Sequence, residues 1–220
     1  MKKTDRLLTV YERLYAAYGP QHWWPGDSPF EVMVGAILTQ SAAWHNVEIG
    51  IANLKAAGML SPAALCQVPV EEIARLIYPC GYYNAKARKL KALVEWLRES
   101  SGDGPVELSG IKTSALRQQL LGVHGIGPET ADSILLYAAG RPVFVIDAYT
   151  RLILARLGLA PAKNTYEDFQ RLFMRILRHD ARLFNEYHAL LVRLGKTACR
   201  RQPLCQECPL FDICPQNKAR

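Results

Sequence analysis

The stretch Val123-His124-Gly125-Ile126-Gly127-Pro128-Glu129-Thr130-Ala131 decides the fold of this chain. Gly125 and Gly127 allow positive φ angles and a close approach of the backbone to a ligand. Pro128 suits the first position of a helix, where its missing N–H costs nothing and the following N–H groups can face an anion. The stretch therefore predicts a hairpin between two helices that can hold a phosphate, although a lone Gly-x-Gly more often marks an ordinary turn.

A carboxylate follows the hairpin closely in sequence. Val143-Phe144-Val145-Ile146 is apolar and has no obvious partner strand, so we interpret it as an extended link that leads into Asp147. Asp147 is placed to cap a helix that starts at Ala148. The same carboxylate can also serve in catalysis, and the two roles do not exclude each other.

Composition indicates a globular protein with a polyanionic partner. Half of the 220 residues are hydrophobic, which is enough for the cores of one or two domains. The net charge is +7, and this favours binding to nucleic acid over a surface that is basic only for solubility. The positive charge is concentrated in two segments, formed by Lys86, Arg88, Lys89 and Lys91 and by Arg193, Lys196, Arg200 and Arg201.

Apolar runs of the ~18 residues that a membrane span requires do not occur. The beginning, Met1-Lys2-Lys3-Thr4, leads into an amphipathic helix without the apolar core of a signal peptide. We therefore expect a cytoplasmic protein. Cysteines in a reducing compartment are explained by metal binding or burial rather than by disulfides.

Four cysteines lie together near the C-terminus as Cys199-x5-Cys205-x2-Cys208-x5-Cys214. They can enclose one metal centre, and the spacing alone leaves zinc and a [4Fe–4S] cluster as alternatives. Arg200 and Arg201 fall inside the first loop, where they can meet DNA phosphates if the metal is structural. The two other cysteines, Cys66 and Cys80, lie in apolar helical segments and are predicted to be buried.

Helical patterns dominate the rest of the chain. Ser28-Pro29-Phe30-Glu31 is a capping box, and Ser61-Pro62 repeats the cap followed by proline. Helical periodicity predicts further helices at about Trp44–Ala57, Val70–Tyr78, Asn84–Glu99, Thr113–Leu121, Pro128–Gly140, Ala148–Leu157, Thr165–Arg178 and Ala181–Lys196. The sequence therefore predicts an all-α protein.

Taken together, the hairpin, an aspartate eighteen residues after Glu129 and the four-cysteine loop resemble the endonuclease III branch of the helix-hairpin-helix DNA glycosylases. The resemblance runs from about Ser28 to Cys214. It implies a two-lobed fold, with a six-helix barrel that contains the hairpin at residues 30–141. Residues 1–29 and 142–220 would form a helical lobe that ends in the cluster loop.

The resemblance also implies a partner, a cofactor and site residues. The partner is double-stranded DNA with a damaged base, which a monomer binds, and the cofactor is a [4Fe–4S] cluster rather than zinc. The first cysteine gap holds five residues where the family more often has six. Gln40 corresponds to a glutamine that fills the gap left in the duplex, and the other DNA-binding candidates are Gly125, Gly127, Lys196, Arg200 and Arg201.

Glu129 departs from the bifunctional members of the family. Their lysine at this position attacks the sugar and forms a Schiff base, and a carboxylate has no amine for that step. Asp147 remains to stabilise the oxocarbenium character of the deoxyribose and to activate a water. Glu129 itself either adds a negative field to the base pocket or only complements the helix dipole.

Aromatic residues suggest which base is released. Trp23, Trp24 and Pro25 precede the first barrel helix, and Trp44 follows Leu38-Thr39-Gln40. With Gly81-Tyr82-Tyr83-Asn84 they resemble 3-methyladenine DNA glycosylase III, although core packing is the ordinary use of such tryptophans. Many members of that subfamily lack the cysteine loop.

Three functions stay open on the sequence. The leading one is a monofunctional glycosylase for alkylated purines, whose cationic bases leave easily and gain cation–π attraction between tryptophan rings. The second is a glycosylase and AP lyase for oxidised pyrimidines. The third is a DNA-binding protein without catalytic activity.

Overall fold

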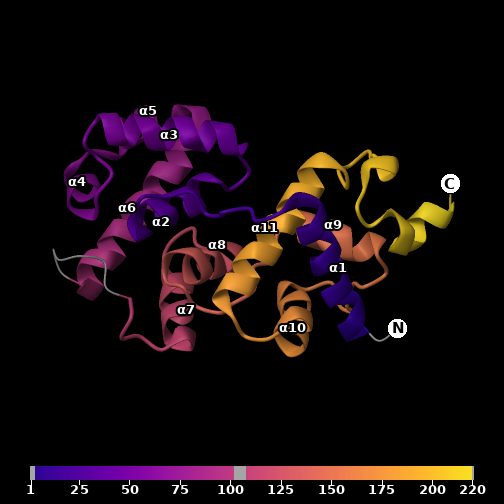
Figure 1. The fold of residues 1–220 in the computed structure, drawn as a ribbon. Coiled ribbons are helices and arrows are strands. Elements are labelled where there is room, and N and C mark those ends of the chain that lie inside the picture. The colour runs from indigo at the N-terminus through magenta and orange to yellow at the C-terminus, as the bar shows by residue number, and fades with distance from the viewer. Residues whose placement is uncertain (1–2, 102–107, 220) are drawn as a thin grey trace. The chain divides into compact units, whose positions relative to one another are not determined.

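The computed structural model describes residues 3–101 and 108–219, and within these ranges the regular structure is entirely helical. This confirms the predicted all-α class. The chain forms two units, coloured along the sequence in Figure 1. The hairpin unit is Pro25–Arg141, and the cysteine unit combines Met1–Trp24 with Pro142–Arg220. The sequence places the first boundary slightly later, at residue 30, and its division into lobes stays a prediction.

The hairpin unit is built around one buried helix. Its elements are α2 (Pro29–Leu38), α3 (Trp44–Ala56), α4 (Pro62–Gln67), α5 (Val70–Leu76), η1 (Tyr78–Cys80), α6 (Tyr83–Ser101), α7 (Thr113–Gly122), α8 (Pro128–Ser133) and η2 (Ile134–Ala138). Residues 30–38 of α2 are all buried, and α2 packs against α3, α6, α8 and η2. A helix that is apolar on every side belongs at the centre of a bundle.

The predicted capping box opens α2. Ser28 accepts a hydrogen bond from the backbone N–H of Glu31 at 3.2 Å, as expected. Glu31 reaches back to the N–H of Asp27 at 3.0 Å, one residue before the cap, and its other oxygen lies 2.8 Å from Lys55 Nζ. The buried Glu31 carboxylate is thus satisfied by two partners.

Proline separates two short helices of the hairpin unit, as the predicted helix starts at Ser61-Pro62 and Val70 indicate. Only Val68 and Pro69 separate α4 from α5. Val68 is extended, with ψ of 138°, because a residue before proline is pushed out of the helical region. The described part of the hairpin unit therefore contains seven α-helices, at the positions that the caps and the helical periodicity predict.

The helix predicted over Pro128–Gly140 changes its geometry halfway. It is α-helical as α8 and then forms the π-helical turn η2, where the N–H of Ala139 donates to the carbonyl of Ile134 at 3.0 Å. A single π-helical turn inside an α-helix shifts the later side chains around the helix axis. Periodicity alone does not reveal such a turn.

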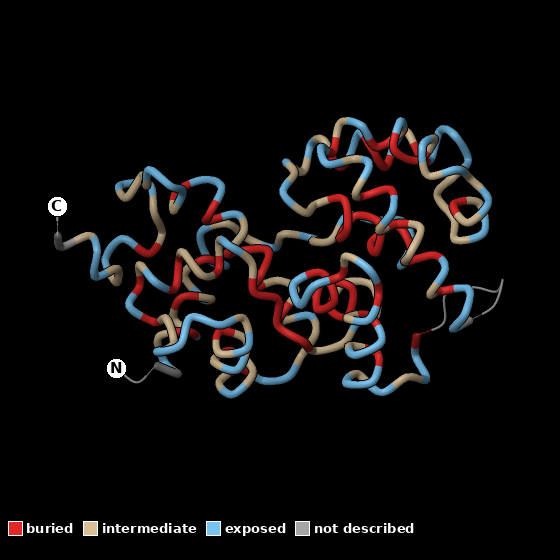
Figure 2. The backbone as a smooth tube through the Cα atoms, turned by 180° about the vertical axis from the view of Figure 1, so that it is seen from behind, coloured by how far each residue is buried: buried red, intermediate tan, exposed pale blue. Residues whose placement is uncertain are grey.

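The cysteine unit contains four α-helices in its described residues. They are α1 (Lys3–Tyr18), α9 (Ala148–Arg156), α10 (Tyr166–Ile176) and α11 (Ala181–Thr197), followed by the short turns η3 (Cys205–Glu207), η4 (Phe211–Ile213) and η5 (Pro215–Ala219). Its core is aromatic, with the rings of Phe144 and Phe173 stacked at 3.8 Å. Figure 2 shows buried stretches of backbone inside each unit, so each has its own core.

Residues 143–146 form a buried non-helical link, as predicted. Gln170 on α10 donates to the carbonyl of Phe144 at 2.8 Å, and the N–H of Ile146 donates to the hydroxyl of Tyr166 at 3.4 Å. Side chains thus take over hydrogen bonds that a neighbouring strand would otherwise make. The link delivers Asp147 to the start of α9.

Two sequence interpretations need correction. Cys80 is buried as predicted, but Cys66 is half-exposed. Lys86, which we counted among the cations available to a polyanion, is 1% exposed. Its Nζ donates to the carbonyls of Leu38 and Cys80 at 2.8 Å each, and burial lowers the pKa of its ammonium. Lys86 thus binds the last carbonyl groups of α2 and η1 inside the core.

Helices that are long and apolar enough to cross a membrane are absent from residues 3–101 and 108–219.

Candidate functional site

The hairpin between α7 and α8 contains two glycines, and only one of them has the positive φ angle that the sequence predicts. Gly125 has φ of +81°, in the left-handed region, whereas Gly127 is extended, with φ of −91° and ψ of −179°. Pro128 occupies the first turn of α8, as expected, and no side chain caps this helix at Gly127. The N–H groups of the first turn of α8 are thus not used by a cap at residue 127, and their binding of an anion stays a prediction.

Gln40 contacts the hairpin directly. It lies just after α2, and its Nε2 donates to the carbonyl of Gly125 at 3.2 Å and to the hydroxyl of Thr130 at 2.9 Å. Its Oε1 accepts from Lys89 Nζ on α6 at 2.5 Å. Sequence reasoning placed Gln40 near DNA but did not single out Lys89, which lay unmarked within a run of cations.

A buried ion pair supports the hairpin from inside. Arg117 on α7 binds Asp132 on α8 through Nε at 2.7 Å and through Nη2 at 3.0 Å. The side chain of Asp132 is fully buried. A bidentate pair of this kind fixes the two helices that flank the hairpin in both distance and direction.

Glu129 lies at the exposed first turn of α8. Its carbonyl accepts a hydrogen bond from the hydroxyl of Ser133 at 2.8 Å. A carboxylate in this position complements the positive end of the helix dipole. This position is compatible with the helix-dipole role of Glu129, and its influence on a base pocket stays a prediction.

Two of the predicted pocket residues line one cavity in the hairpin unit. Pro25 and Trp44 form part of a cavity of about 190 Å³, whose other lining residues are Glu48, Ile51, Ala52 and Lys55. Trp44 Nε1 donates to Glu48 Oε1 at 2.8 Å. The sequence analysis missed Glu48, although its i+4 spacing from Trp44 on a predicted helix was a usable signal.

The other two tryptophans belong to the cysteine unit. The rings of Trp23 and Trp24 lie 5.1 Å apart at an interplanar angle of 53°. Lys196, near the end of α11, places its Nζ 5.9 Å from the centroid of the Trp23 ring. This distance is within the range of a cation–π contact, so Trp23 already attracts a cation of the protein itself.

Asp147 caps α9, as predicted, in a largely desolvated place. Its Oδ1 accepts from the N–H of Thr150 at 2.7 Å and lies 3.8 Å from His188 Nε2. The side chains of Asp147 and His188 are 13% and 8% exposed. Burial lowers the pKa of His188, while the charge of Asp147 opposes this effect. Nothing in the sequence marked His188 as a neighbour of Asp147.

The helices that carry Asp147 and His188 approach closely at Gly195. A Cβ at Gly195 on α11 would overlap the ring of Tyr149 on α9. Only glycine therefore permits this helix crossing. The contact fixes the distance between the start of α9 and α11.

The four C-terminal cysteines line a single cavity. Cys199, Cys205, Cys208 and Cys214 border a space of about 50 Å³, and burial raises the pKa of the thiols of Cys199 and Cys208. Across the described chain, no three Cys, His, Asp or Glu side chains are close enough to hold one metal ion.

Arg156, which the sequence analysis missed, braces the cysteine loop. Its Nη1 lies 3.3 Å from Cys199 Sγ and donates to the carbonyl of Arg200 at 2.8 Å, and its Nη2 donates to the carbonyl of Arg201 at 3.2 Å. The predicted DNA contacts Arg200 and Arg201 are both exposed on this loop. The loop is therefore held from α9 while its cations face solvent.

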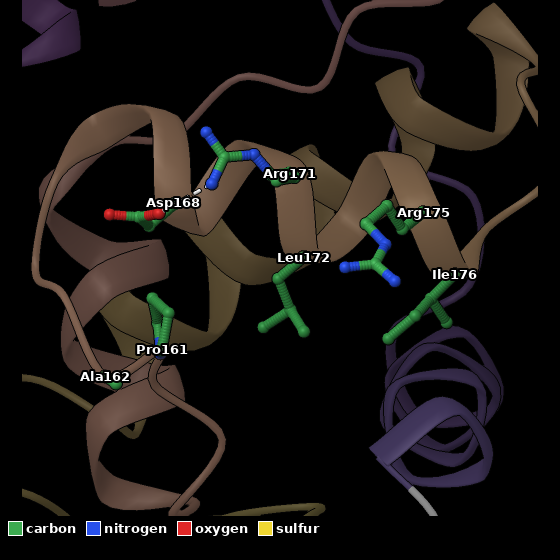
Figure 3. A pocket seen from close by; sticks show the side chains of 7 residues that line it. All are labelled: Pro161, Ala162, Asp168, Arg171, Leu172, Arg175 and Ile176. Carbon is green, nitrogen blue, oxygen red and sulfur yellow. Dashed lines mark hydrogen bonds and ion pairs between the residues drawn. The ribbon is translucent and has the colours of Figure 1, made fainter.

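A larger cavity than the one at Trp44 contains none of the predicted site residues. It measures about 460 Å³ and lies along α10, where Arg171 pairs with Asp168 at 2.9 Å (Figure 3). Leu172, Arg175 and Ile176 follow on the same helix. Size alone therefore does not identify the functional site here.

The comparison with protein families decides the identity. Residues 34–179 match the model of the HhH-GPD superfamily of base excision DNA repair proteins. The chain belongs to this superfamily. A candidate DNA repair glycosylase of Methanocaldococcus jannaschii is 41% identical over 213 residues, which cover 96% of this chain and 97% of that protein.

Solved structures agree with this membership of the HhH-GPD superfamily. A non-covalent endonuclease III–DNA complex has a TM-score of 0.85 at 21% identity, covers 100% of this chain and 99% of its own, and shows a common fold. Helicobacter pylori 3-methyladenine DNA glycosylase bound to 1,N6-ethenoadenine has a TM-score of 0.76 at 25% identity, covering 89% of this chain and 98% of that chain. The protein is thus a DNA glycosylase of base excision repair.

Proposed function

We propose that this HhH-GPD protein is a monofunctional DNA glycosylase that releases alkylated purines of the 3-methyladenine type from duplex DNA. The observation that carries the proposal is the cavity formed by Pro25 and Trp44, with the carboxylate of Glu48 bound to the indole N–H. An aromatic face beside a negative group suits a flat cation. The 25% identity with a 3-methyladenine DNA glycosylase supports the same substrate class.

Alkylation at N3 or N7 makes a purine cationic, and this explains why such a pocket favours the damaged base. A cation over a tryptophan face gains about 0.5 to 2 kcal/mol relative to a neutral ring. The contact between Lys196 and Trp23 supports an equivalent role for Trp23 and Trp24, since the first of these rings already attracts an ammonium. A cationic base is also a good leaving group, so the pocket needs no strong general acid.

Asp147 supplies the remaining chemistry in this proposal. Both of its described contacts are made by Oδ1, as the cap of α9 and as the neighbour of His188. A carboxylate held by one oxygen can present the other to the deoxyribose, stabilise its oxocarbenium character and orient a water. Its low exposure strengthens that field because solvent screens it less.

Glu129 distinguishes this reaction from the bifunctional one. The alternative is an endonuclease III-type glycosylase and AP lyase for oxidised pyrimidines, which needs an amine at this position to form the covalent intermediate. Glu129 is an exposed carboxylate and cannot supply it. We assign Glu129 to the field around the base and expect base release without strand cleavage.

DNA contacts complete the assignment. We propose that the backbone at Gly125 and Gly127 holds a phosphate, that Gln40 fills the gap left by the extruded base, and that Lys196, Arg200 and Arg201 bind further phosphates. The net charge of +7 supports a polyanionic partner. We expect a monomer that acts on chromosomal DNA in the cytoplasm.

We also propose that the cysteine loop holds a [4Fe–4S] cluster. The support is that all four cysteines line one cavity beside Arg156, although in the described chain no three of them lie close enough together to hold one metal ion. Bound there, the cluster would supply a structural crosslink for a segment with little core of its own. Iron analysis and visible absorbance of the purified protein test this assignment, and zinc at one equivalent per chain would overturn it.

The decisive experiment separates base release from strand cleavage. Duplexes that carry 7-methylguanine, 3-methyladenine, thymine glycol or an abasic site are incubated with the protein and analysed with and without alkali. We expect release of the methylpurines, with strand breaks only after alkali. Borohydride trapping of a protein–DNA adduct would favour the lyase, and the absence of any released base would leave DNA binding as the sole function.

A second measurement tests the pocket itself. Glu48→Gln keeps an oxygen that accepts from Trp44 but removes the charge, so release of cationic 7-methylguanine should fall about threefold to tenfold. Release of neutral 1,N6-ethenoadenine should change less than about twofold, because it lacks the charge that Glu48 would attract. Glu71→Gln on α5 is the matched control for removal of an exposed carboxylate. Equal losses for both bases would contradict the proposed role of Glu48.

A further inference from the structure

Three distant segments of the hairpin unit meet at Gly125. Lys89 on α6 donates through Nζ to Gln40 Oε1 at 2.5 Å, and Gln40 Nε2 donates to the carbonyl of Gly125 and to the hydroxyl of Thr130. The side-chain amide of Gln40 therefore uses its oxygen and both of its N–H groups within the protein. In this state the hydrogen bonds of Gln40 connect the end of α2 to the hairpin.

The hydrocarbon chain of Lys89 also lies across Gly125. A Cβ on Gly125 would overlap the Cγ, Cδ and Cε atoms of Lys89. Gly125 is thus required twice, by its φ of +81° and by the lysine that packs against its Cα. The ammonium of Lys89 consequently lies beside the hairpin that is proposed to receive a phosphate.

These contacts conflict with the gap-filling position of Gln40. To enter the duplex, Gln40 must release three hydrogen bonds that the protein supplies. The strongest of them joins an ammonium to a neutral amide oxygen, and a phosphate oxygen is a better partner for the same ammonium because both groups are charged. When DNA reaches the hairpin, the ammonium of Lys89 can therefore exchange its hydrogen bond with Gln40 for one with a phosphate oxygen.

We propose that Lys89 is a positioning residue, which holds Gln40 on the hairpin in the free protein and releases it when a phosphate binds the ammonium. The proposal rests on the assigned phosphate grip of the hairpin and on the gap-filling role of Gln40. It does not depend on which base is excised. Lys89 thereby couples arrival of the DNA backbone to occupation of the gap.

The test uses a duplex that needs no excision. It carries a tetrahydrofuran abasic analogue opposite 2-aminopurine, whose fluorescence changes when a side chain enters the gap. Lys89→Met keeps the hydrocarbon chain over Gly125 and removes the charge, whereas Lys89→Arg keeps the charge. Arg88→Met, an exposed cation on the same helix, is the matched control.

For Lys89→Met we expect weaker DNA binding, with the slope of log affinity against log salt reduced by about one. Because Lys89 no longer holds Gln40 on the hairpin, the fluorescence change at saturating protein should develop at least about threefold faster than in the wild type. Lys89→Arg should restore most of both effects, and Arg88→Met should keep the wild-type fluorescence kinetics. Thermal unfolding of each variant confirms that it is folded.

A double variant tests whether Lys89 acts through Gln40. In a Gln40→Ala background, Lys89→Met should change DNA affinity but should leave the fluorescence kinetics of that background unchanged. An undiminished effect of Lys89→Met in that background would overturn the proposal, as would wild-type fluorescence kinetics in the single variant. Loss of affinity alone would make Lys89 a simple phosphate contact and would equally overturn it.

Discussion

The starts of α8 and α9 solve the same physical problem in opposite ways. Each helix begins with N–H groups that lack partners within the helix. At α8 the preceding residue is Gly127, which has no side chain to offer, and Pro128 follows. At α9 the preceding residue is Asp147, whose carboxylate accepts from the N–H of Thr150. One helix start has no side-chain cap, and the other already holds an anion of the protein.

The two helix starts also differ in their exposure to solvent. Gly127, Pro128 and Glu129 are exposed, so an anion that binds there stays partly hydrated. Asp147 and His188 are largely buried, so the charge of Asp147 is less screened. The comparison teaches that the exposed helix start suits reversible binding of a backbone, whereas the buried one suits stabilisation of a short-lived positive charge.

Removal of the Asp147 charge should have the largest effect. Asp147→Asn can still cap α9, but it cannot stabilise an oxocarbenium ion, so single-turnover base release should fall by at least about 100-fold. DNA affinity should stay within about twofold of the wild type, since the hairpin is unchanged. Gel-based excision assays and fluorescence anisotropy measure the two quantities.

Asp180→Asn is the matched control for this substitution. Asp180 caps α11 by accepting from the N–H groups of Arg182 and Leu183, and these hydrogen bonds lower the pKa of its carboxyl. It should lose no more than a few-fold in base release. Equal loss in the two variants would assign the effect to helix capping and not to catalysis.

A methyl group at Gly125 should reduce DNA binding by about tenfold. Gly125→Ala forces a side chain into the left-handed region and against Lys89, at a cost of about 1 to 3 kcal/mol in the free energy of unfolding. Gly127→Ala is its control, because Gly127 is extended and a Cβ there meets no atom within 4 Å. Similar affinities of the two variants would show that the hairpin conformation does not govern binding.

The smallest effect concerns His188 and the pH dependence of stability. Its pKa in the folded protein is lowered below the ordinary 6.5, so the unfolded chain takes up the proton first as the pH falls. Stability is therefore complete above pH 6.5 and declines as the pH falls from 6.5 toward the lowered pKa, by at most about 1.4 kcal/mol per pH unit. Urea titrations between pH 7 and 5 measure this decline.

Substitutions of two histidines sharpen the contrast between the regions. His188→Gln should flatten the decline, whereas His124→Gln in the exposed hairpin should leave it as in the wild type. If His188→Gln kept the full pH dependence, another group would be responsible for it.

Local patterns predicted much of this fold. Ser28, Ser61 and Thr165 cap helices where their sequence neighbours indicate, because each cap depends on residues within three positions. The start of α5 directly after Pro69 was predicted, whereas the π-helical turn after Ser133 was not. Such a turn leaves no periodic signal in the sequence.

The candidate site was predictable only where it depends on a contiguous motif. The hairpin, Asp147 and the four cysteines are short motifs, and they led to the family that the comparison confirmed. Lys89, Arg156 and His188 contact residues that lie 41 to 49 positions away along the chain. Only the folded chain brings such residues together, so a single sequence could not identify them.

The contact between Gly195 and Tyr149 has a consequence for engineering. The side chain of Tyr149 occupies the place that a Cβ at residue 195 would take, so the size of residue 195 limits how close α9 can stand to α11. Alanine at this position would push the helices apart and lengthen the separation of Asp147 from His188, while both side chains stay chemically intact. A substitution at residue 195 would thus change the electrostatic environment of Asp147 by moving a helix, although residue 195 itself has no functional group.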